Sequence, residues 1–247
     1  MKKIYILWLR QLKRYWRSKS RIAGSLFQPL LYMIAMGYGL GAVFAKAGQG
    51  DYLDFLVPGI VGMNIIFTSM FSGMDVIWDR QFGFLKEMLV APLSRYSIMI
   101  GRTVGTATIA TGQGFVVMLL ALLIGFRMPV AAAIPAILIM FLISLLFTAL
   151  STMIGSLLKD MQGFQAVMNF LIMPLFLLSG ALYPLSGLPK ILQVITNLDP
   201  LSYGIDAMRA ILINTSTFSL GTDILVLSGF TAVFLFLGGY FFKKVQI

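Results

Sequence analysis

The chain has no cysteine, no histidine and few charged residues. Without cysteine it forms no disulfide, offers no thiolate nucleophile and binds no metal through sulfur. Without histidine it lacks the commonest general base and metal ligand at neutral pH. Charged residues make up 11% of the 247 positions, whereas a soluble domain carries roughly 25%. The sequence therefore excludes an ordinary soluble domain, and covalent chemistry would have to rest on nine acidic residues.

Apolar residues are abundant instead, at 59% of the chain, with a mean hydropathy of +0.91. These values exclude intrinsic disorder, which needs low hydrophobicity and high charge density. A helix needs about 20 apolar residues to cross a bilayer, and six stretches nearly free of charge meet that length. Their continuous apolar character favours helices over barrel strands, which alternate every second residue. We expect an all-α, polytopic membrane protein, a single domain over residues 1–247, with spans at about 22–45, 55–78, 97–126, 129–158, 163–184 and 222–242.

The basic residues predict the orientation of the chain. With six spans and a cytoplasmic N-terminus, both termini are cytoplasmic, and most of the 19 lysines and arginines lie on that side, as the positive-inside rule requires. The exceptions are Lys46, Arg127, Lys190 and Arg209. We expect a multi-pass protein of the cell (plasma or inner) membrane. The net charge of +10 then reflects topology and attraction to anionic lipid, and nucleic acid is not an expected partner.

Two segments outside the spans have patterns of their own. Residues 2–21 place apolar and aromatic residues opposite lysines and arginines at helical spacing, which predicts an amphipathic helix lying at the membrane interface. That helix either only anchors the chain or also contacts a cytoplasmic partner. Residues 184–222, between spans five and six, predict short re-entrant external helices, because irregular backbone at membrane depth needs a cover of protein or water.

The first cytoplasmic loop, residues 79–95, is too long for a tight turn. Residues 84–91 fit two turns of helix, which Pro92 ends, because the residue before a proline disfavours helical angles. The loop carries apolar side chains on the water side of the membrane, which need a covering surface. That surface is either the ends of the protein's own spans or another protein. The side chains are Phe84, Leu85, Met88 and Leu89.

Several kinds of chemistry are absent. No Gly-Lys pair occurs, so the chain has no P-loop and cannot hydrolyse ATP by that route. The uninterrupted apolar runs of these spans, such as 55–74, 103–126 and 224–242, contain no Asp, Glu, Lys or Arg, which disfavours a proton-coupled carrier, and no selectivity filter is evident. An ATP-independent secondary transporter or channel remains one alternative. The other is a lipid-modifying enzyme that uses Asp75 and Asp79, which share one helical face. No metal site is expected.

Uncharged polar residues occur within the spans at helical spacing. Asn64, Thr68 and Ser72 share one face, and Gly101 and Gly105 form a small-residue pair. Such residues usually join helices by close approach and hydrogen bonds. Lining a substrate path is the alternative, and it is strongest for the fifth span. The candidate path residues are Gln165, Asn169, Phe176 and Ser179.

Two motifs make the chain resemble the membrane-spanning subunit of type-2 ABC exporter permeases. The first lies in the first loop, where the spacing Arg-x-x-Gly-x-x-x-Glu-x-Leu-x-x-Pro-Leu runs from Arg80 to Leu93. Phe84 departs from it, since many members of the family have a small polar residue there. The second motif lies between spans five and six. It comprises Ser179-Gly180-Ala181-Leu182-Tyr183-Pro184, then Asn197-Leu198-Asp199-Pro200-Leu201-Ser202-Tyr203, then Asp206 and Arg209.

This resemblance implies a division of labour. Two permease copies, here as a homodimer, form the path, and two separate ABC ATPase subunits bind ATP and magnesium, so this chain needs no cofactor of its own and is not an enzyme. ATP drives alternating access for export of a hydrophobic or amphiphilic substrate such as a drug, a lipid or a lipid-linked glycan. The residues that the resemblance assigns to ATPase coupling are Arg80, Phe84, Leu85, Glu87, Met88, Leu89 and Pro92. Those that it assigns to an external gate are Pro184, Pro200, Tyr203, Asp206 and Arg209. Asp206 and Arg209 are expected to pair, either as part of that gate or as a structural salt bridge.

Overall fold

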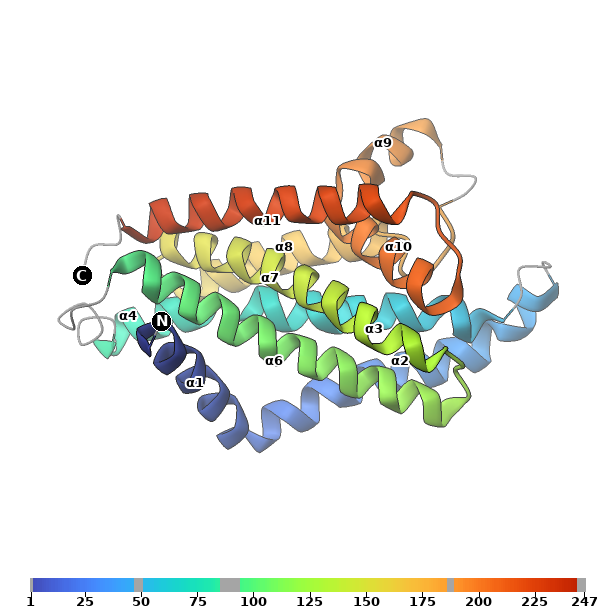
Figure 1. Cartoon of the computed structure of the whole chain (residues 1–247), viewed down its shortest axis with the longest axis horizontal. Coiled ribbons are helices and arrows are strands. Elements are labelled where there is room, and N and C mark those ends of the chain that lie inside the picture. The colour runs from blue at the N-terminus through green and yellow to red at the C-terminus, as the bar shows by residue number, and fades with distance from the viewer. Residues whose placement is uncertain (1, 47–50, 85–93, 186–188, 244–247) are drawn as a thin grey trace.

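The computed structural model describes residues 2–46, 51–84, 94–185 and 189–243 (Figure 1). Over these ranges the chain consists of helices and connecting turns, without a strand, which confirms the predicted all-α class. The helices are α1 (Lys2–Arg17), α2 (Lys19–Lys46), α3 (Tyr52–Phe71), α4 (Met74–Gln81), α6 (Arg95–Ile124), α7 (Ala133–Leu157), α8 (Met161–Leu178), α9 (Lys190–Leu198), α10 (Pro200–Ile213) and α11 (Leu220–Lys243), with a 3-10 turn at Val130–Ala132.

The described helices include several that can span a membrane. Five segments are long and apolar enough, and they match five of the six expected spans: Tyr52–Gln81, Arg95–Ile124, Val130–Leu157, Met161–Leu178 and Leu220–Lys243. The expected first span, 22–45, lies within the 28-residue helix α2, which is not one of these five. The chain is therefore a multi-pass helical membrane protein.

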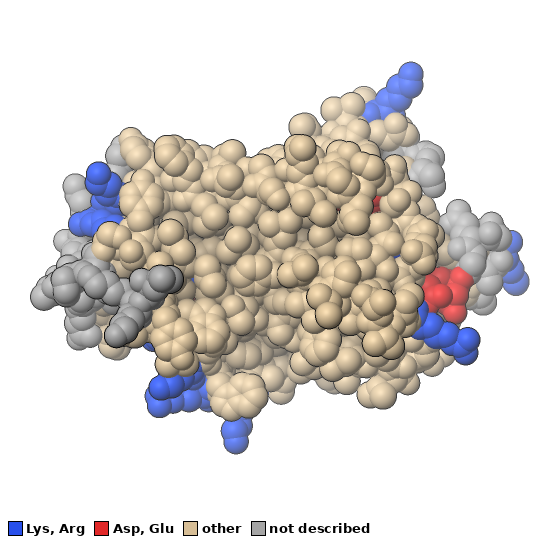
Figure 2. Space-filling view, viewed as in Figure 1, with Lys and Arg blue, Asp and Glu red and all other residues tan. Residues whose placement is uncertain are grey.

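The long helices run side by side along the longest axis of the molecule (Figure 1). One end holds α1, α4 and the carboxyl end of α11, and we call it the α4 end. The opposite end holds α9 and α10, and we call it the α10 end. On the face drawn in Figure 2, the lysines and arginines lie toward the two ends and along one edge, and the broad middle carries no charge. An uncharged belt between charged ends is what a bilayer requires.

Helix ends follow from side chains that cap the backbone. Asp51, Ser94, Asp160 and Asp199 are the N-caps of α3, α6, α8 and α10, and each side chain accepts a hydrogen bond from a backbone N–H of the first turn. Gly125, with φ of 118°, ends α6 in the left-handed conformation that glycine adopts without strain.

The structure corrects three expected boundaries. The predicted span 55–78 is interrupted, because α3 ends at Phe71 and α4 begins at Met74. The predicted span 163–184 ends earlier, since α8 stops at Leu178 and Gly180 turns the chain with φ of 72°. The predicted interfacial helix 2–21 ends at Arg17, after which α2 begins at Lys19 and leaves in a new direction (Figure 1).

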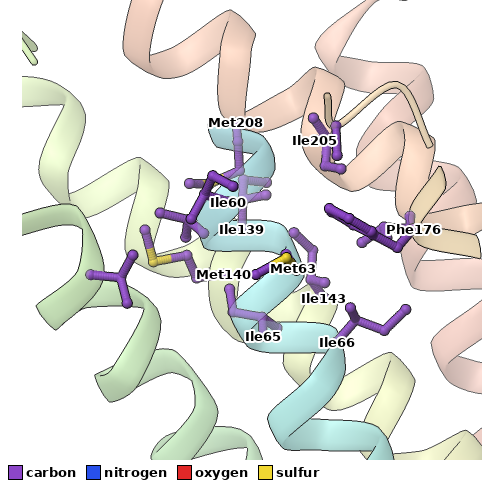
Figure 3. Packing of buried hydrophobic residues seen from close by; sticks show 14 of the residues in the cluster. Ile60, Met63, Ile65, Ile66, Ile139, Met140, Ile143, Phe176, Ile205 and Met208 are labelled. Carbon is purple, nitrogen blue, oxygen red and sulfur yellow. The ribbon is translucent and has the colours of Figure 1, made fainter. Parts of the chain in front are cut away.

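Helix α3 lies at the centre of the bundle. Figure 3 shows its side chains Ile60, Met63 and Ile66 interdigitated with side chains of α7, α8 and α10 such as Ile139, Phe176 and Met208. All six are buried. Because lipid tails are as apolar as these side chains, close packing rather than exclusion from water stabilises such a core.

The break between α3 and α4 is also a close contact with α7. The backbone N–H of Gly73 donates to Ser151 Oγ at 2.8 Å, and Ser151 Oγ donates to the carbonyl oxygen of Met70. A Cβ added to Gly155 would lie 2.5 Å from the carbonyl oxygen of Gly73, so only glycine fits at that position. The contact fixes the direction in which α4 leaves the bundle.

We predict that Gly155→Val destabilises the protein by about 1–3 kcal/mol, because the new side chain forces α7 away from Gly73. The measurement is thermal unfolding of the purified chain in detergent. The matched control is Gly229→Val on α11, where an added Cβ meets open space. The apparent Tm of this variant should equal that of the wild type. Equal Tm values for the two variants would contradict this account of the break.

Candidate functional site

A cluster of ion pairs joins three helices at the α4 end. Asp79 of α4 contacts Arg102 of α6, and both side chains are almost fully buried, at 2% and 3% exposure. Asp79 also lies 3.3 Å from Arg10 of α1, and Asp75 lies 3.0 Å from Arg14 of α1. Both carboxylates are thus occupied by arginines, so the pair lacks the free acid that a lipid-modifying enzyme would need.

Helix α1 packs on α6 with its apolar side, which corrects the expectation that this side faces lipid. Leu7 lies against Gly101, where an added Cβ would come within 2.8 Å of Leu7 Cβ. Trp8 Nε1 donates to Thr108 Oγ1 at 3.1 Å. The small residue on α6 lets α1 approach closely, so contact with protein replaces contact with lipid. Of the apolar and aromatic residues of α1, Tyr5, Ile6 and Trp16 remain exposed.

Arg80, expected as a contact to an ATPase, is used within the chain. Its guanidinium donates to the carbonyl oxygens of Ser156 and Leu158, both at 3.0 Å, where α7 ends. The next side chain, Gln81, donates to the carbonyl of Lys159. These bonds tie α4 to the turn between α7 and α8.

Of the other expected coupling residues, only Phe84 lies in the described part of the chain, and its side chain is 50% exposed. Outside the described residues lie Leu85, Glu87, Met88, Leu89 and Pro92.

Sequence reasoning missed two aromatic residues beside Phe84. Trp78 and Phe82 stack with ring centroids 4.9 Å apart, and Phe82 is 59% exposed. With Phe84 they border a cavity of about 710 Å³ whose opposite wall is the basic face of α1. Their spacing of four residues, directly after the apolar stretch, was the available signal. We call Trp78, Phe82 and Phe84 the aromatic patch.

At the α10 end, Arg209 of α10 is buried and holds backbone rather than a carboxylate. Its Nη2 donates to the carbonyl oxygens of Gly180 at 2.7 Å, Phe55 at 3.3 Å and Ala181 at 3.4 Å. The guanidinium also lies 3.8 Å from the centroid of the Phe55 ring. One side chain therefore joins α10, the start of α3 and the turn after α8.

Asp206 does not pair with Arg209, contrary to expectation. Its carboxylate accepts hydrogen bonds from the backbone N–H groups of Thr217 and Phe218 at 2.8–3.0 Å. Tyr203, one turn earlier, stacks on the Phe218 ring and donates its hydroxyl proton to the carbonyl of Asn197. The two charged residues are separated because each satisfies backbone groups of a different connection.

The expected gate residues nevertheless gather in one place. A cavity of about 650 Å³ at the α10 end is bordered by Pro184, Asp206 and Arg209, and also by Ser179, which was expected on the substrate path. Pro200 is buried as the first residue of α10, directly after its cap Asp199. The sequence motif thus corresponds to one compact cap, which we define as α10 with the connections on either side of it and the turn after α8.

The four candidate path residues do not share one surface. Gln165 and Asn169 lie on the exposed face of α8, beside the exposed Phe170. Phe176 and Ser179 are buried, and Ser179 Oγ donates to the carbonyl of Phe176. The structure therefore divides the set between the outer face of α8 and the cap.

Polar residues elsewhere in the spans join helices, as expected. Asn64 Nδ2 of α3 donates to the carbonyl of Ser25 in α2 at 2.8 Å. Gln113 of α6 donates to Ser25 Oγ at 2.8 Å and to the Tyr15 hydroxyl at 2.6 Å. Thr68 of α3 donates to the amide oxygen of the same Gln113. Four helices thus meet at one amide.

Burial shifts the pKa of two groups in the cap. It raises the pKa of Asp199 from 3.8 to about 7, against the opposing effect of hydrogen bonds from the Leu201 N–H and the Ser202 hydroxyl. It lowers the pKa of Arg209 to about 10, and nearby Asp206 counteracts this change. Arg209 therefore stays charged at neutral pH, while Asp199 titrates close to it.

These features define a multi-pass helical protein whose two ends differ, one ionic and aromatic, the other a cap held by backbone contacts. Residues 2–213 match the family described as ABC-2 type transporter, so the chain belongs to this family and is a membrane transport permease subunit of an ABC transporter. It is 34% identical over 253 residues to the putative transport permease ycf38 of Cyanophora paradoxa, covering 95% of this chain and 84% of that protein.

Bacterial relatives support the same assignment. Nodulation protein J of Rhizobium leguminosarum bv. trifolii is 28% identical over 196 residues, which cover 78% of this chain and 74% of that protein. Nodulation protein J of Rhizobium meliloti is 27% identical over 220 residues, which cover 87% and 83%. Permeases of this family work with ABC ATPase subunits and are not themselves enzymes.

The ion pairs of the α4 end should differ in strength. Asp79→Asn leaves Arg102 buried without a counter-charge and should lower the free energy of unfolding by about 3–5 kcal/mol. Asp75→Asn should cost about 1 kcal/mol or less, because its partner Arg14 is 37% exposed. Denaturation of both variants in mixed detergent tests this, and equal losses would contradict it.

The cap should lose stability as pH rises. The folded protein holds the Asp199 proton more tightly than the unfolded chain, so this contribution is complete below pH 3.8 and is lost as pH rises to about 7. Asp199→Asn keeps a capping oxygen but cannot ionise. The Tm of the wild type relative to this variant should fall across that range by the equivalent of up to about 1.4 kcal/mol per pH unit. A constant difference would show that Asp199 does not titrate there.

Proposed function

We propose that this chain is the permease of an ABC exporter, with two copies forming the path and two ATPase subunits supplying energy. In this arrangement α2 also spans the membrane and brings the number of spans to six, because residues 22–45 carry no charge and the helix is 28 residues long. The α4 end and both termini face the cytoplasm of the cell membrane, where most of the lysines and arginines then lie. ATP and magnesium bind to the partner subunits, because this chain has no P-loop.

The observation that carries the proposal is the exposed aromatic patch at the α4 end. Aromatic rings facing water beside a membrane need a partner surface, and aromatic residues dominate the energetics of protein interfaces. The coupling motif continues directly from Phe84, so patch and motif form one contact region for the ATPase.

The bonds of α4 support its role in transmitting movement. Arg80 ties this helix to the turn between α7 and α8, and Asp79 ties it to Arg102 of α6. A displacement of the coupling loop therefore moves several spans together rather than bending one. Closure of the ATPase dimer would tilt these spans as rigid bodies and switch access from one side to the other.

At the α10 end, the cap is the proposed outer gate. Arg209 closes it by holding the carbonyls of Phe55 and Gly180, and opening requires these bonds to break or move together. Arg209 itself borders the cavity, together with Ser179, Pro184 and Asp206.

Exposed side chains of α8 support both a second permease copy and the proposed class of substrate. Gln165 and Asn169 are exposed on a helix that also exposes Phe170, and polar groups facing lipid are costly. A second copy, with the path between the two, relieves that cost. The mixture of amide and aromatic groups fits a hydrophobic or amphiphilic substrate such as a drug, a lipid or a lipid-linked glycan.

The test is a double variant of the aromatic patch, Phe82→Ser with Phe84→Ser. Both rings are largely exposed, so folding should be retained, while co-purification of the ATPase and ATP-driven transport should fall about tenfold or more. Ile191→Ser with Leu198→Ser is the matched control, since both side chains are exposed on α9 at the opposite end. Undiminished complex and transport in the first variant would remove the patch from the coupling role.

The same preparation distinguishes the proposed ABC permease from an ATP-independent transporter or channel. Vesicles that contain the permease alone should show no uphill flux, whereas vesicles that also contain the ATPase should.

A further inference from the structure

Helices α1 and α2 meet at Ser18 and diverge as the two arms of a V, with α6 lying across its open side (Figure 1). Between the three helices lies a cavity of about 750 Å³, within the size range of small-ligand sites. We call it the elbow cavity. The coupling role and the gate make no use of it.

The walls of the elbow cavity are mostly apolar, and its charged groups are all basic. Apolar side chains come from all three helices: Leu12 and Trp16, Ile22 and Leu26, Ile109 and Val116. Among the described residues that border the cavity, the charged ones are Lys13 and Arg17, and none is acidic. The amide of Gln113, bonded to the Tyr15 hydroxyl and to Ser25, closes one side.

The basic residues of α1 differ in their partners. Arg10 and Arg14 pair with Asp79 and Asp75. Lys13 and Arg17 take part in none of the ion pairs between described residues, and they lie where the elbow cavity meets the cavity of the aromatic patch. Two cations at the rim of an apolar space are therefore available for an anion from outside the chain.

The apolar part of the cavity continues along α6. Val116, which borders it, is followed at three- and four-residue spacing by Leu119 and Leu123, and all three are exposed. This row runs from the elbow toward the α10 end, in the direction that an acyl chain would take from the membrane surface inward. Trp16, 78% exposed at the rim, is a residue type that favours the headgroup region.

We propose that the elbow cavity binds an anionic phospholipid of the surrounding bilayer, with its phosphate between Lys13 and Arg17 and one acyl chain in the cavity and along α6. Basic pockets between helices at the cytoplasmic surface suit such headgroups. The inference rests on the proposed orientation, in which the α4 end is cytoplasmic. A bound lipid would brace α1 against α2 and so hold α1, with its ion pairs to α4, in place.

Gly112 offers a direct way to fill the cavity. It borders the space, and an added Cβ would meet no atom within 4 Å. Gly112→Phe therefore introduces a ring on the side where the acyl chain is proposed to lie, and its Cβ meets no protein atom. Gly229 on α11 has the same open surroundings, and Gly229→Phe is the matched control.

The experiment uses the full chain in phosphatidylcholine vesicles and measures quenching of tryptophan fluorescence by lipids with brominated acyl chains. The signal from Trp16 is the part that disappears in Trp16→Phe. Brominated phosphatidylglycerol should quench it at a concentration about fivefold or more below that of brominated phosphatidylcholine. Equal quenching by the two lipids would overturn the proposal.

The variants distinguish a specific lipid-binding site from general attraction of anionic lipid to surface charge. Lys13→Gln with Arg17→Gln should abolish the preference for phosphatidylglycerol, and Lys159→Gln with Lys190→Gln, which removes the same charge elsewhere, should keep it. Gly112→Phe should suppress quenching and Gly229→Phe should not. Loss of the preference in both charge variants, unchanged quenching in Gly112→Phe, or displacement of the lipid by soluble glycerol phosphate would each overturn the proposal. No ATPase is present, so the result is independent of the coupling role.

Discussion

The buried pair of Asp79 and Arg102 determines the arrangement of the α4 end. A charge removed from water must find a partner, and here the partners lie on helices that are distant in the sequence. Asp79 sits on a helix only eight residues long, whose direction is set by the glycine contact with α7. Because Asp79 also reaches Arg10, the same carboxylate decides where α1 lies. The exposed aromatic patch and the elbow cavity both follow from that position, since each is bordered by α1.

Arginine serves two different purposes at the two ends. At the α4 end Arg10, Arg14 and Arg102 meet carboxylates, which links helices through charge, while Arg80 donates to the carbonyls at the end of α7. At the α10 end Arg209 meets carbonyl oxygens and an aromatic ring, which links helix α10 to the start of α3 and to the turn after α8 through the backbone. Carbonyls cannot change their charge, so that link is insensitive to protonation of the acceptor. In the same cap, the group whose protonation changes with pH is Asp199, because burial raises its pKa.

Hydropathy was enough to predict the helical class and five of the spans, because a bilayer imposes length and composition directly. It could not reveal the break at Gly73, since neither charge nor proline marks it and its cause is a contact with Gly155 far along the chain. Gly101 was recognised as a packing residue, but its partner, Leu7, lies in a segment whose apolar side has the pattern of a lipid-facing helix. Asp206 and Arg209 were expected to pair within the gate segment that the family resemblance implies. Their backbone partners lie in connections whose course no periodicity describes.

The central position of α3 has a consequence for biogenesis. Nearly three quarters of its most apolar stretch is buried inside the protein, largely by helices that follow it in the sequence. Translation delivers α3 to the membrane before α6, α7 and α10 exist, so surface that ends up enclosed must first contact lipid. Asp79, on the following helix α4, likewise lacks its partner Arg102 until α6 is synthesised. During synthesis, the surface of α3 that later forms the centre of the bundle is therefore at first exposed to lipid.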